Sequence, residues 1–172
     1  LRAAWYVQHA SNPYTMIRTM MKKLIPLIIL LIPTTAKADP QTCMAQAMYF
    51  EARSQGVLGM LAVGVVIRNR VDHPAYPSTV CGVVRQGRLS DGRVYKWQCQ
   101  FTFYCDGKPE IPTDPEAWTT ALSLARIVLD SRLTLQGLEK ATHYHATTVQ
   151  PTWARRFRPC KQIGGHIFYV SR

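Results

Sequence analysis

Hydrophobic residues recur at helical spacing over residues 42–54. Four side chains separated by three or four positions fall on one stripe of a helix: Met44, Ala47, Met48 and Glu51. Burial of a carboxylate on such a stripe is costly and raises its pKa toward the range of a general acid at neutral pH. The alternative to a functional acid is a structural ion pair with one of three arginines: Arg53, Arg68 or Arg70.

Three further helices are predicted downstream. "GVLGMLAVGVVIRNRVD" is apolar nearly all round, which indicates a helix buried at the centre of a small domain, although "AVGVVI" alone also fits a strand. Ser78 is expected to cap a short helix through "TVCGVVRQ". "TDPEAWTTALSLARIVLDS" gives the clearest helix, with Thr113 or Asp114 as its cap and Pro115 in the first turn.

Strands are expected in two places. Residues 87–112 are rich in glycine, aromatic and polar residues without a helical period, which predicts a loop with some strand. In the tail, "ATHYHATTV" and "GGHIFYV" are separated by a loop that contains proline and arginine, so a small hairpin or sheet is predicted. The whole pattern predicts an α+β fold that is mainly helical.

The first 38 residues differ in character from the rest. "MKKLIPLIILLIPTTAKADP" has a basic start, an apolar run over residues 24–32 and a small-residue end, which is typical of a secretory signal peptide cleaved after Ala38. The apolar run is about half of the roughly 20 residues that span a bilayer, which disfavours a membrane anchor. We therefore predict three segments: an upstream extension over residues 1–20, a signal peptide over 21–38 and one mature domain over 39–172.

Charge narrows the choice of partner. The chain has a formal charge of +11, and five of its basic residues but none of its acidic ones precede residue 39, so the mature domain remains basic at +6. A basic exported protein fits nucleic acid, anionic lipid or an anionic wall polymer such as peptidoglycan. Because no run of Lys and Arg is interleaved with aromatic residues, the pattern does not favour nucleic acid.

Every cysteine lies in the predicted mature domain: Cys43, Cys81, Cys99, Cys105 and Cys160. Export permits disulfides, but five thiols cannot all pair within one chain. Cys99 and Cys105 are spaced to close a local loop, and the other three then supply one bridge and one free thiol. Spacing leaves the connectivity open. The chain contains no CxxC pair, which disfavours a cysteine zinc site.

The segment "CQFTFYCDG" offers candidate chemistry besides Glu51. Its aromatic residues alternate with Gln100 and Thr102, a mixture that holds a sugar by stacking and hydrogen bonds, with Phe101 as a stacking ring. The alternative is a strand whose phenylalanines belong to the core.

The histidines allow two interpretations. "HYH" places His143 and His145 on one face of a strand around Tyr144, and His166 lies on a neighbouring segment. Three histidines could bind zinc as in a hydrolase, or they could line a cleft as hydrogen-bonding groups. A Cys–His nucleophilic pair is a third possibility, which oxidation of the thiols in an exported chain disfavours.

Five blocks in order carry a family resemblance: "AQAMYFEARSQGVLGMLAVGVVIRNRV", "YPSTVCGVVRQ", "CQFTFYCDG", "ATHYHATTVQPTWA" and "IGGHIFY". Together they resemble the SleB-type cell wall hydrolases, the family of the spore cortex-lytic enzyme catalytic domains, over residues 43–170. The resemblance implies a lysozyme-like (lytic transglycosylase-like) single domain with a small β element. It also implies lytic transglycosylase action on peptidoglycan, with the Glu of the "YFEAR" block as the catalytic acid, which is Glu51.

One departure bears on mechanism. Where the family often reads "EARGE", this chain reads "EARSQ", so Gln55 stands where a second carboxylate is expected. Glycoside hydrolysis usually uses two carboxylates about 5 to 9.5 Å apart, whereas a transglycosylase manages with one. Asp106 is the remaining candidate for a second group.

These observations predict an exported enzyme, periplasmic or extracellular, that cleaves the MurNAc–GlcNAc bond of peptidoglycan glycan strands and leaves 1,6-anhydro-MurNAc ends. Glu51 is the predicted catalytic residue, and we expect no cofactor and no metal. The predicted substrate-binding residues are Gln100, Phe101, Thr102, His143, Tyr144 and His145. We expect a monomer with no nucleic-acid partner and no stable membrane anchor after cleavage. The alternatives are a zinc amidase or peptidase that uses the histidines, and a wall-binding module without turnover. A bacterial enzyme and a phage endolysin both fit.

Overall fold

The computed structural model describes residues 39–171. The predicted extension over 1–20 and signal peptide over 21–38 lie outside the described residues. The elements are α1 (Pro40–Ala52), η2 (Arg53–Gln55), α2 (Gly56–Val71), α3 (Val80–Val84), β1 (Gly87–Ser90), β2 (Arg93–Cys99), η3 (Thr102–Cys105), α4 (Pro115–Ser131), β3 (Ala141–Ala146), η4 (Thr152–Arg156), β4 (Arg158–Ile163) and β5 (His166–Val170). This order confirms the predicted α+β, mainly helical fold.

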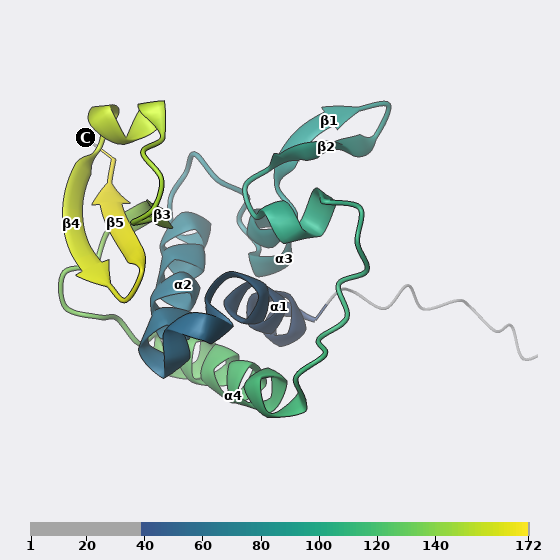
Figure 1. Cartoon of the computed structure of the whole chain (residues 1–172), viewed down its shortest axis with the longest axis horizontal. Coiled ribbons are helices and arrows are strands. Elements are labelled where there is room, and N and C mark those ends of the chain that lie inside the picture. Colours follow the sequence, from purple (N-terminus) through teal and green to yellow (C-terminus); the bar gives the residue numbers. More distant parts are fainter. Residues whose placement is uncertain (1–38, 172) are drawn as a thin grey trace, which may run out of the picture. The chain divides into compact units, whose positions relative to one another are not determined.

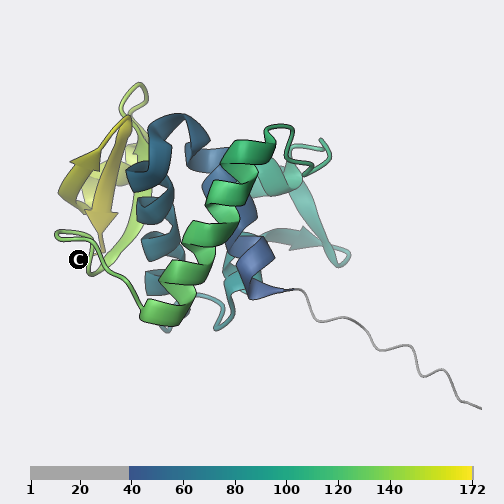
Figure 2. The ribbon, with the colours of Figure 1, turned by 90° about the horizontal axis from the view of Figure 1, so that it is seen from below.

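Helix α1 is the centre of the helical part. Asp39 caps it, because its Oδ2 accepts hydrogen bonds from the backbone N–H and the hydroxyl of Thr42 at 2.9 and 2.6 Å. The apolar residues of the predicted stripe are buried and Glu51 is partly buried. The helices α2, α3 and α4 also pack on other sides of α1, and Figure 2 shows α4 lying across it. The buried residues of α1 are Cys43, Met44, Ala45, Ala47, Met48, Tyr49 and Ala52.

Helix α2 is apolar all round because it separates two hydrophobic clusters. Met60, Val63 and Ile67 pack with α1 and α4. The other side of α2, which includes Val65 and Val66, packs on the C-terminal sheet. "AVGVVI" is therefore helix and not strand. Gly64 leaves room for a side chain of α1, since a Cβ at this position would collide with Cε of Met48.

The stretch Pro40–Val71 is long and apolar enough to cross a membrane by composition alone. Its two helices are separated by the turn Arg53–Gln55, and α2 begins at Gly56, which has a φ of 68°. Both helices form the core of the domain, and this role accounts for their apolar composition.

The helix caps agree with the predictions in one of two cases. Asp114 caps α4 and accepts hydrogen bonds from the backbone N–H groups of Glu116 and Ala117. The prediction of Ser78 as the cap of α3 is wrong. Thr79 is the cap, because its hydroxyl accepts a hydrogen bond from the backbone N–H of Gly82 at 3.1 Å and the helix begins one residue later than the sequence indicates.

The tail forms a three-stranded antiparallel sheet in the order β3–β5–β4. The prediction of a loop for the segment of β4 is wrong, because its proline and arginine residues are typical of an edge strand as well as of a loop. The sheet lies beside α2, whereas the separate hairpin β1–β2 lies next to α3 (Figure 1). Phe168 and Ile163 pack one face of the sheet against α2.

Two disulfides match the predicted count. Cys99–Cys105 closes the expected local loop, and Cys43–Cys81 connects α1 to α3. Cys160, on β4, is the free thiol of the described residues. Its thiol donates a hydrogen bond to the backbone carbonyl of Phe168, with 3.4 Å between Sγ and the oxygen.

This pairing predicts one titratable thiol in the oxidised protein under denaturing, non-reducing conditions, and five after reduction. A colorimetric thiol assay measures both numbers. The Cys160→Ser variant should give none before reduction and four after it. Three or five thiols in the unreduced wild-type protein would contradict the pairing.

Candidate active site

Glu51 lies in the last turn of α1, with its side chain partly buried. The hydroxyl of Tyr144 donates a hydrogen bond to Oε2 of Glu51 at 3.1 Å, across 93 positions of sequence. Successive side chains of a strand point to opposite faces of the sheet. Tyr144 therefore faces α2, whereas His143 and His145 on either side of it face away from α2. Docking of the sheet on α2 therefore brings the Tyr144 hydroxyl to the carboxyl.

The electrostatic balance keeps Glu51 protonated to higher pH than an exposed glutamate. Burial raises the pKa of Glu51, and this effect exceeds the lowering by the Tyr144 hydrogen bond and by the charge of Arg70. Burial and the charge of Glu51 raise the pKa of Tyr144 well above its ordinary value. The phenol therefore remains a hydrogen-bond donor, and the carboxyl keeps its proton to higher pH than an exposed glutamate does.

Arg70 is the charged neighbour of this pair. Its side chain is 4% exposed, and its Nε donates to the backbone carbonyl of Thr142 at 2.7 Å. The register between β3 and β5 shifts at Thr142, so this residue has no partner on β5 and its carbonyl is available to the arginine. The guanidinium carbon lies 5.4 Å from the ring centroid of Tyr76 and 5.3 Å from that of Phe101.

None of the three arginines considered from the sequence forms an ion pair with Glu51. The ion pairs among the described residues are Arg126–Asp130 and Arg132–Asp72. Arg53 is exposed and its guanidinium stacks over the ring of Tyr49, while Arg68 donates to the backbone carbonyl of Leu133. Arg70 lowers the pKa of Glu51 through its charge, without a direct pair. The structural ion-pair interpretation of Glu51 is therefore not supported.

The three predicted sugar-binding residues of the segment "CQFTFYCDG" differ in their exposure to solvent. Gln100 and Thr102 are exposed, so their assignment as substrate-binding residues stays a prediction. Phe101 is 1% exposed and packs beside Phe103 and the guanidinium of Arg70, so the prediction that it stacks on a sugar is corrected. An alternating aromatic pattern alone could not distinguish a core ring from an exposed one.

The histidines do not converge. His143 and His145 contact Trp153 on the outer face of the sheet. His166 is opposite Ala146 in the register and packs on Tyr144, on the other face. Within residues 39–171 no three His, Cys, Asp or Glu side chains are grouped so that they could hold a metal ion. The strand period therefore does not support the three-histidine zinc site considered from the sequence.

His143 and His145 also differ from each other. Burial and the charge of Arg70 lower the pKa of His143 to about 4, so this imidazole is neutral at neutral pH. Its ring is 6.4 Å from that of Tyr76, close to the surroundings of Arg70. Both ring nitrogens of His145 already have partners, the carbonyl of Ala146 and the hydroxyl of Tyr169. These partners do not favour substrate binding by His145, and the assignments of His145 and His143 as substrate-binding residues stay predictions.

Two contacts beside Glu51 add residues that sequence reasoning did not assign to a site. Gln55 accepts a hydrogen bond from the backbone N–H of Gly165 at 2.7 Å, which connects the α1–α2 turn to the β4–β5 turn. The ring of Phe50 stacks on that of Phe103 at 4.9 Å between centroids, which fixes η3 next to the end of α1. Only adjacency to Glu51 in the sequence could have indicated Phe50.

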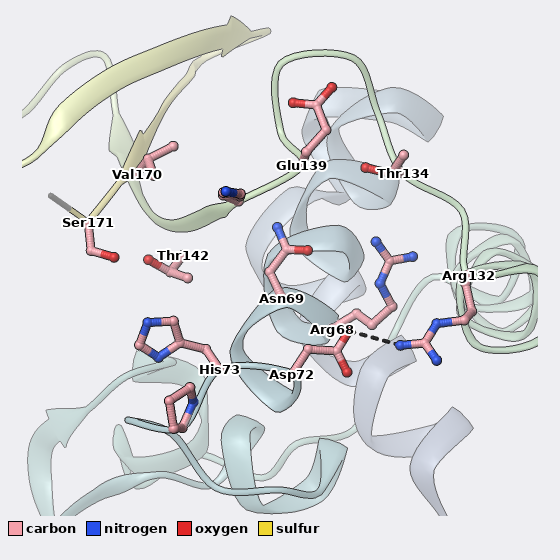
Figure 3. A pocket seen from close by; sticks show the side chains of 12 residues that line it. Arg68, Asn69, Asp72, His73, Arg132, Thr134, Glu139, Thr142, Val170 and Ser171 are labelled. Carbon is pink, nitrogen blue, oxygen red and sulfur yellow. Dashed lines mark hydrogen bonds and ion pairs between the residues drawn. The ribbon is translucent and has the colours of Figure 1, made fainter.

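A surface cavity of about 580 Å³ lies at the C-terminal end of α2 (Figure 3). Arg68, Asn69 and His73 line one side of it, and the ion pair between Arg132 and Asp72 closes another. Glu51 is not among its lining residues. We therefore do not identify this cavity with the candidate active site.

A family model described as cell wall hydrolase matches residues 54–169. The chain belongs to the cell wall hydrolase family. This confirms the resemblance drawn from the five sequence blocks. The matched range begins three residues after Glu51, so the assignment of Glu51 depends on the resemblance of the "YFEAR" block and on the geometry described above.

The curated relatives are spore cortex-lytic enzymes. One from Bacillus cereus is 43% identical over 138 residues, which cover 80% of this chain and 46% of the relative. One from Halalkalibacterium halodurans is 32% identical over 126 residues, which cover 73% of this chain and 33% of the relative. The chain thus spans less than half the length of these relatives.

Two solved structures share the fold of this cell wall hydrolase. The catalytic domain of the germination-specific lytic transglycosylase SleB from Bacillus anthracis matches with a TM-score of 0.57 and 28% identity, covering 80% of this chain and 99% of that chain. The catalytic domain of the Bacillus cereus SleB protein matches with a TM-score of 0.54 and 28% identity, covering 80% and 94%. The fold is therefore that of a SleB catalytic domain.

The position of Arg70 predicts a charge effect on Glu51. In Arg70→Gln the pKa of Glu51 should rise further, because the positive charge that favours the carboxylate is removed while the burial remains. Carbon-detected NMR titration of glutamate-labelled protein measures this pKa, and Glu51→Gln identifies the resonance.

Arg68→Gln is the matched control, since Arg68 lies on the same helix and also donates to a backbone carbonyl, but does not act on Glu51. The control should lose stability without moving the Glu51 pKa. Equal pKa values in Arg70→Gln, Arg68→Gln and wild type would show that Arg70 is only a structural residue.

Proposed function

We propose that residues 39–172 form a peptidoglycan lytic domain that cleaves the MurNAc–GlcNAc bond, with Glu51 as its general acid. The observation that carries this proposal is the partly buried Glu51 carboxyl, with a raised pKa and one oxygen held by the Tyr144 hydroxyl. Membership of the cell wall hydrolase family and the similarity to a lytic transglycosylase catalytic domain support it.

In the first step the protonated Glu51 transfers its proton to the glycosidic oxygen, and the bond from this oxygen to C1 of MurNAc breaks. Positive charge develops at C1 while negative charge develops on the carboxyl. The Tyr144 hydroxyl and the charge of Arg70 stabilise that carboxylate, since both favour the ionised form. The GlcNAc-bearing fragment leaves with the proton.

In the second step the Glu51 carboxylate accepts the proton of the MurNAc C6 hydroxyl. O6 forms a bond to C1, so the product is a 1,6-anhydro end, and Glu51 returns to its protonated state. The step needs no second carboxylate. Gln55, at the position where one is expected, is neutral and already bonded to Gly165, and Asp106 accepts from the backbone N–H of Lys108 in its own turn. These contacts favour transglycosylation over hydrolysis.

We further propose that residues 21–38 direct export and are removed, and that the mature domain acts at the wall as a monomer without cofactor. Peptidoglycan is the substrate that the family suggests. The zinc amidase or peptidase alternative loses support because strand alternation places His166 on the opposite face from His143 and His145. A wall-binding module without turnover is tested by the first experiment below.

Replacement of Glu51 by Gln removes the transferable proton but keeps the shape of the side chain. Clearing of purified walls should fall by at least the roughly 10²- to 10⁴-fold typical of a lost general acid. Turbidity loss gives the rate, and mass spectrometry of fragments from the wild-type digest should find 1,6-anhydro ends. Glu116→Gln, in the exposed first turn of α4, is the control and should retain full activity.

A folded Glu51→Gln variant that cleaves walls at the wild-type rate would exclude Glu51 as the acid. Reducing MurNAc ends in place of anhydro ends would retain Glu51 but establish hydrolysis. A wild-type protein that sediments with walls and releases no fragment would establish the binding module.

The same variant should show a pH-dependent gain in stability. Because the folded-state pKa of Glu51 is raised, the carboxyl favours folding most at pH below its ordinary value of 4.5, and this contribution is lost as pH rises through the folded-state pKa. Glu51→Gln should thus melt at or above the wild-type temperature at pH 7, and its relative advantage should shrink toward pH 4. Calorimetry at both pH values measures this. A large loss at pH 7 would indicate instead that Glu51 neutralises Arg70.

A further inference from the structure

The β1–β2 hairpin presents large aromatic side chains to solvent. Trp97 is 59% exposed and Tyr95 is 44% exposed, and we call these two residues the aromatic platform. Both belong to β2, in the part of the chain just before the predicted sugar-binding segment. Exposed rings of this size contribute little to the core, so burial does not explain them.

The backbone of β2 is distorted where the platform lies. Gly87 pairs with Cys99 and Leu89 pairs with Val94, so β2 contains three more residues than β1 between these two pairs. Trp97 lies within this bulge and has a φ of 62°. Positive φ is strained for a bulky residue, and glycine or asparagine adopts it more easily. A bulge changes the direction of a side chain, and strain of this kind is concentrated at functional sites.

Cationic side chains flank both rings. The guanidinium carbon of Arg88 lies 5.7 Å from the centroid of Tyr95, and Nζ of Lys96 lies 5.4 Å from that of Trp97. A cation over one face of a ring leaves the other face available for stacking. Positive charges next to exposed rings fit a ligand that has both apolar C–H surfaces and carboxylates.

The hairpin is fixed to the end of α1 that carries Glu51. The disulfide Cys99–Cys105 joins the end of β2 to η3. Within η3, Phe103 stacks on Phe50, the residue before Glu51. The platform and the proposed acid are therefore connected through packed side chains and not through a free loop.

We propose that Trp97 and Tyr95 form a stacking subsite for the glycan strand, away from the bond that Glu51 cleaves. The sugar rings lie on the aromatic faces, and the carboxylates of the wall peptide stems lie near Arg88 and Lys96. This assignment rests on the proposed function, because it takes the substrate class from it. It replaces Phe101, whose ring is buried, as the aromatic contact to the sugar.

An anionic membrane surface is the other ligand class that aromatic and basic side chains fit. The tip of the hairpin argues against it, because the turn between β1 and β2 is formed by Asp91 and Gly92 and flanked by Ser90 and Arg93. The turn itself is therefore polar, although Leu89 beside it is 63% exposed, and Tyr95 and Trp97 lie farther from the turn, along the flank of the hairpin. A flank suits an extended polymer that lies across it.

The test measures binding in a Glu51→Gln background, so that cleavage plays no part. Trp97→Gly removes the ring and suits the positive φ, so the variant should fold at least as well as its parent. Its dissociation constant for purified glycan strands without peptide stems should rise about tenfold, the order expected for a lost aromatic stack. Trp97→Phe should restore most of the affinity. Ile127→Ala, an exposed apolar residue of α4, is the control and should not change it.

A spectroscopic readout covers the case in which a variant is unstable. Addition of glycan strands to the Glu51→Gln protein should shift the tryptophan emission, and Trp97→Phe should remove that shift. Unchanged emission, or unchanged affinity in folded Trp97→Gly, would overturn the proposal. Binding to phosphatidylglycerol vesicles without binding to strands would replace it with a membrane site. Wall cleavage that persists in Glu51→Gln would refute the proposed acid but leave the platform result valid.

Discussion

The domain depends on keeping one carboxyl partly out of water without a direct ionic partner. Burial favours the neutral form of Glu51, and the Tyr144 hydroxyl and the Arg70 charge favour the ionised form, with burial the larger effect. Such a balance requires that the surrounding groups are held rigidly. The central position of α1, with helices on several sides, supplies one half of that rigidity, and the sheet docked on α2 supplies the other.

The C-terminal sheet serves this carboxyl through both its side chains and its backbone. The pleat directs Tyr144 inward, and the irregular register at Thr142 releases a carbonyl that orients Arg70. The β4–β5 turn is also connected to the end of α1, because the backbone N–H of Gly165 donates a hydrogen bond to the side chain of Gln55. A side-chain amide is sufficient for this contact, so the exchange of a carboxylate for Gln55 preserves the junction while removing a charge next to Glu51.

The sequence predicted those features that depend on local spacing. The stripe that contains Glu51 and the long helix α4 with its Asp114 cap follow from local patterns, the β-rich tail from the composition of its segments, and the number of disulfides from the count of cysteines. Phe101, His145 and β4 could not be predicted in the same way. Whether Phe101 and His145 are buried, and whether β4 joins the sheet, depends on strand register and on packing between distant segments. A single sequence does not contain this information. Trp97 was missed because a bulge of three residues does not leave a periodic pattern.

The position of the free thiol has a consequence for biogenesis. Cys160 lies 79 positions after Cys81, whereas Cys43 and Cys81 are separated by 38. Under the proposed N-terminus-first export, Cys81 meets Cys43 before the segment of β4 enters the oxidising compartment. The order of emergence then favours the native pair over pairing with Cys160. Refolding of the complete chain from denaturant lacks this order, and all five sulfhydryls then compete, so disulfide isomerases become more important there than during secretion.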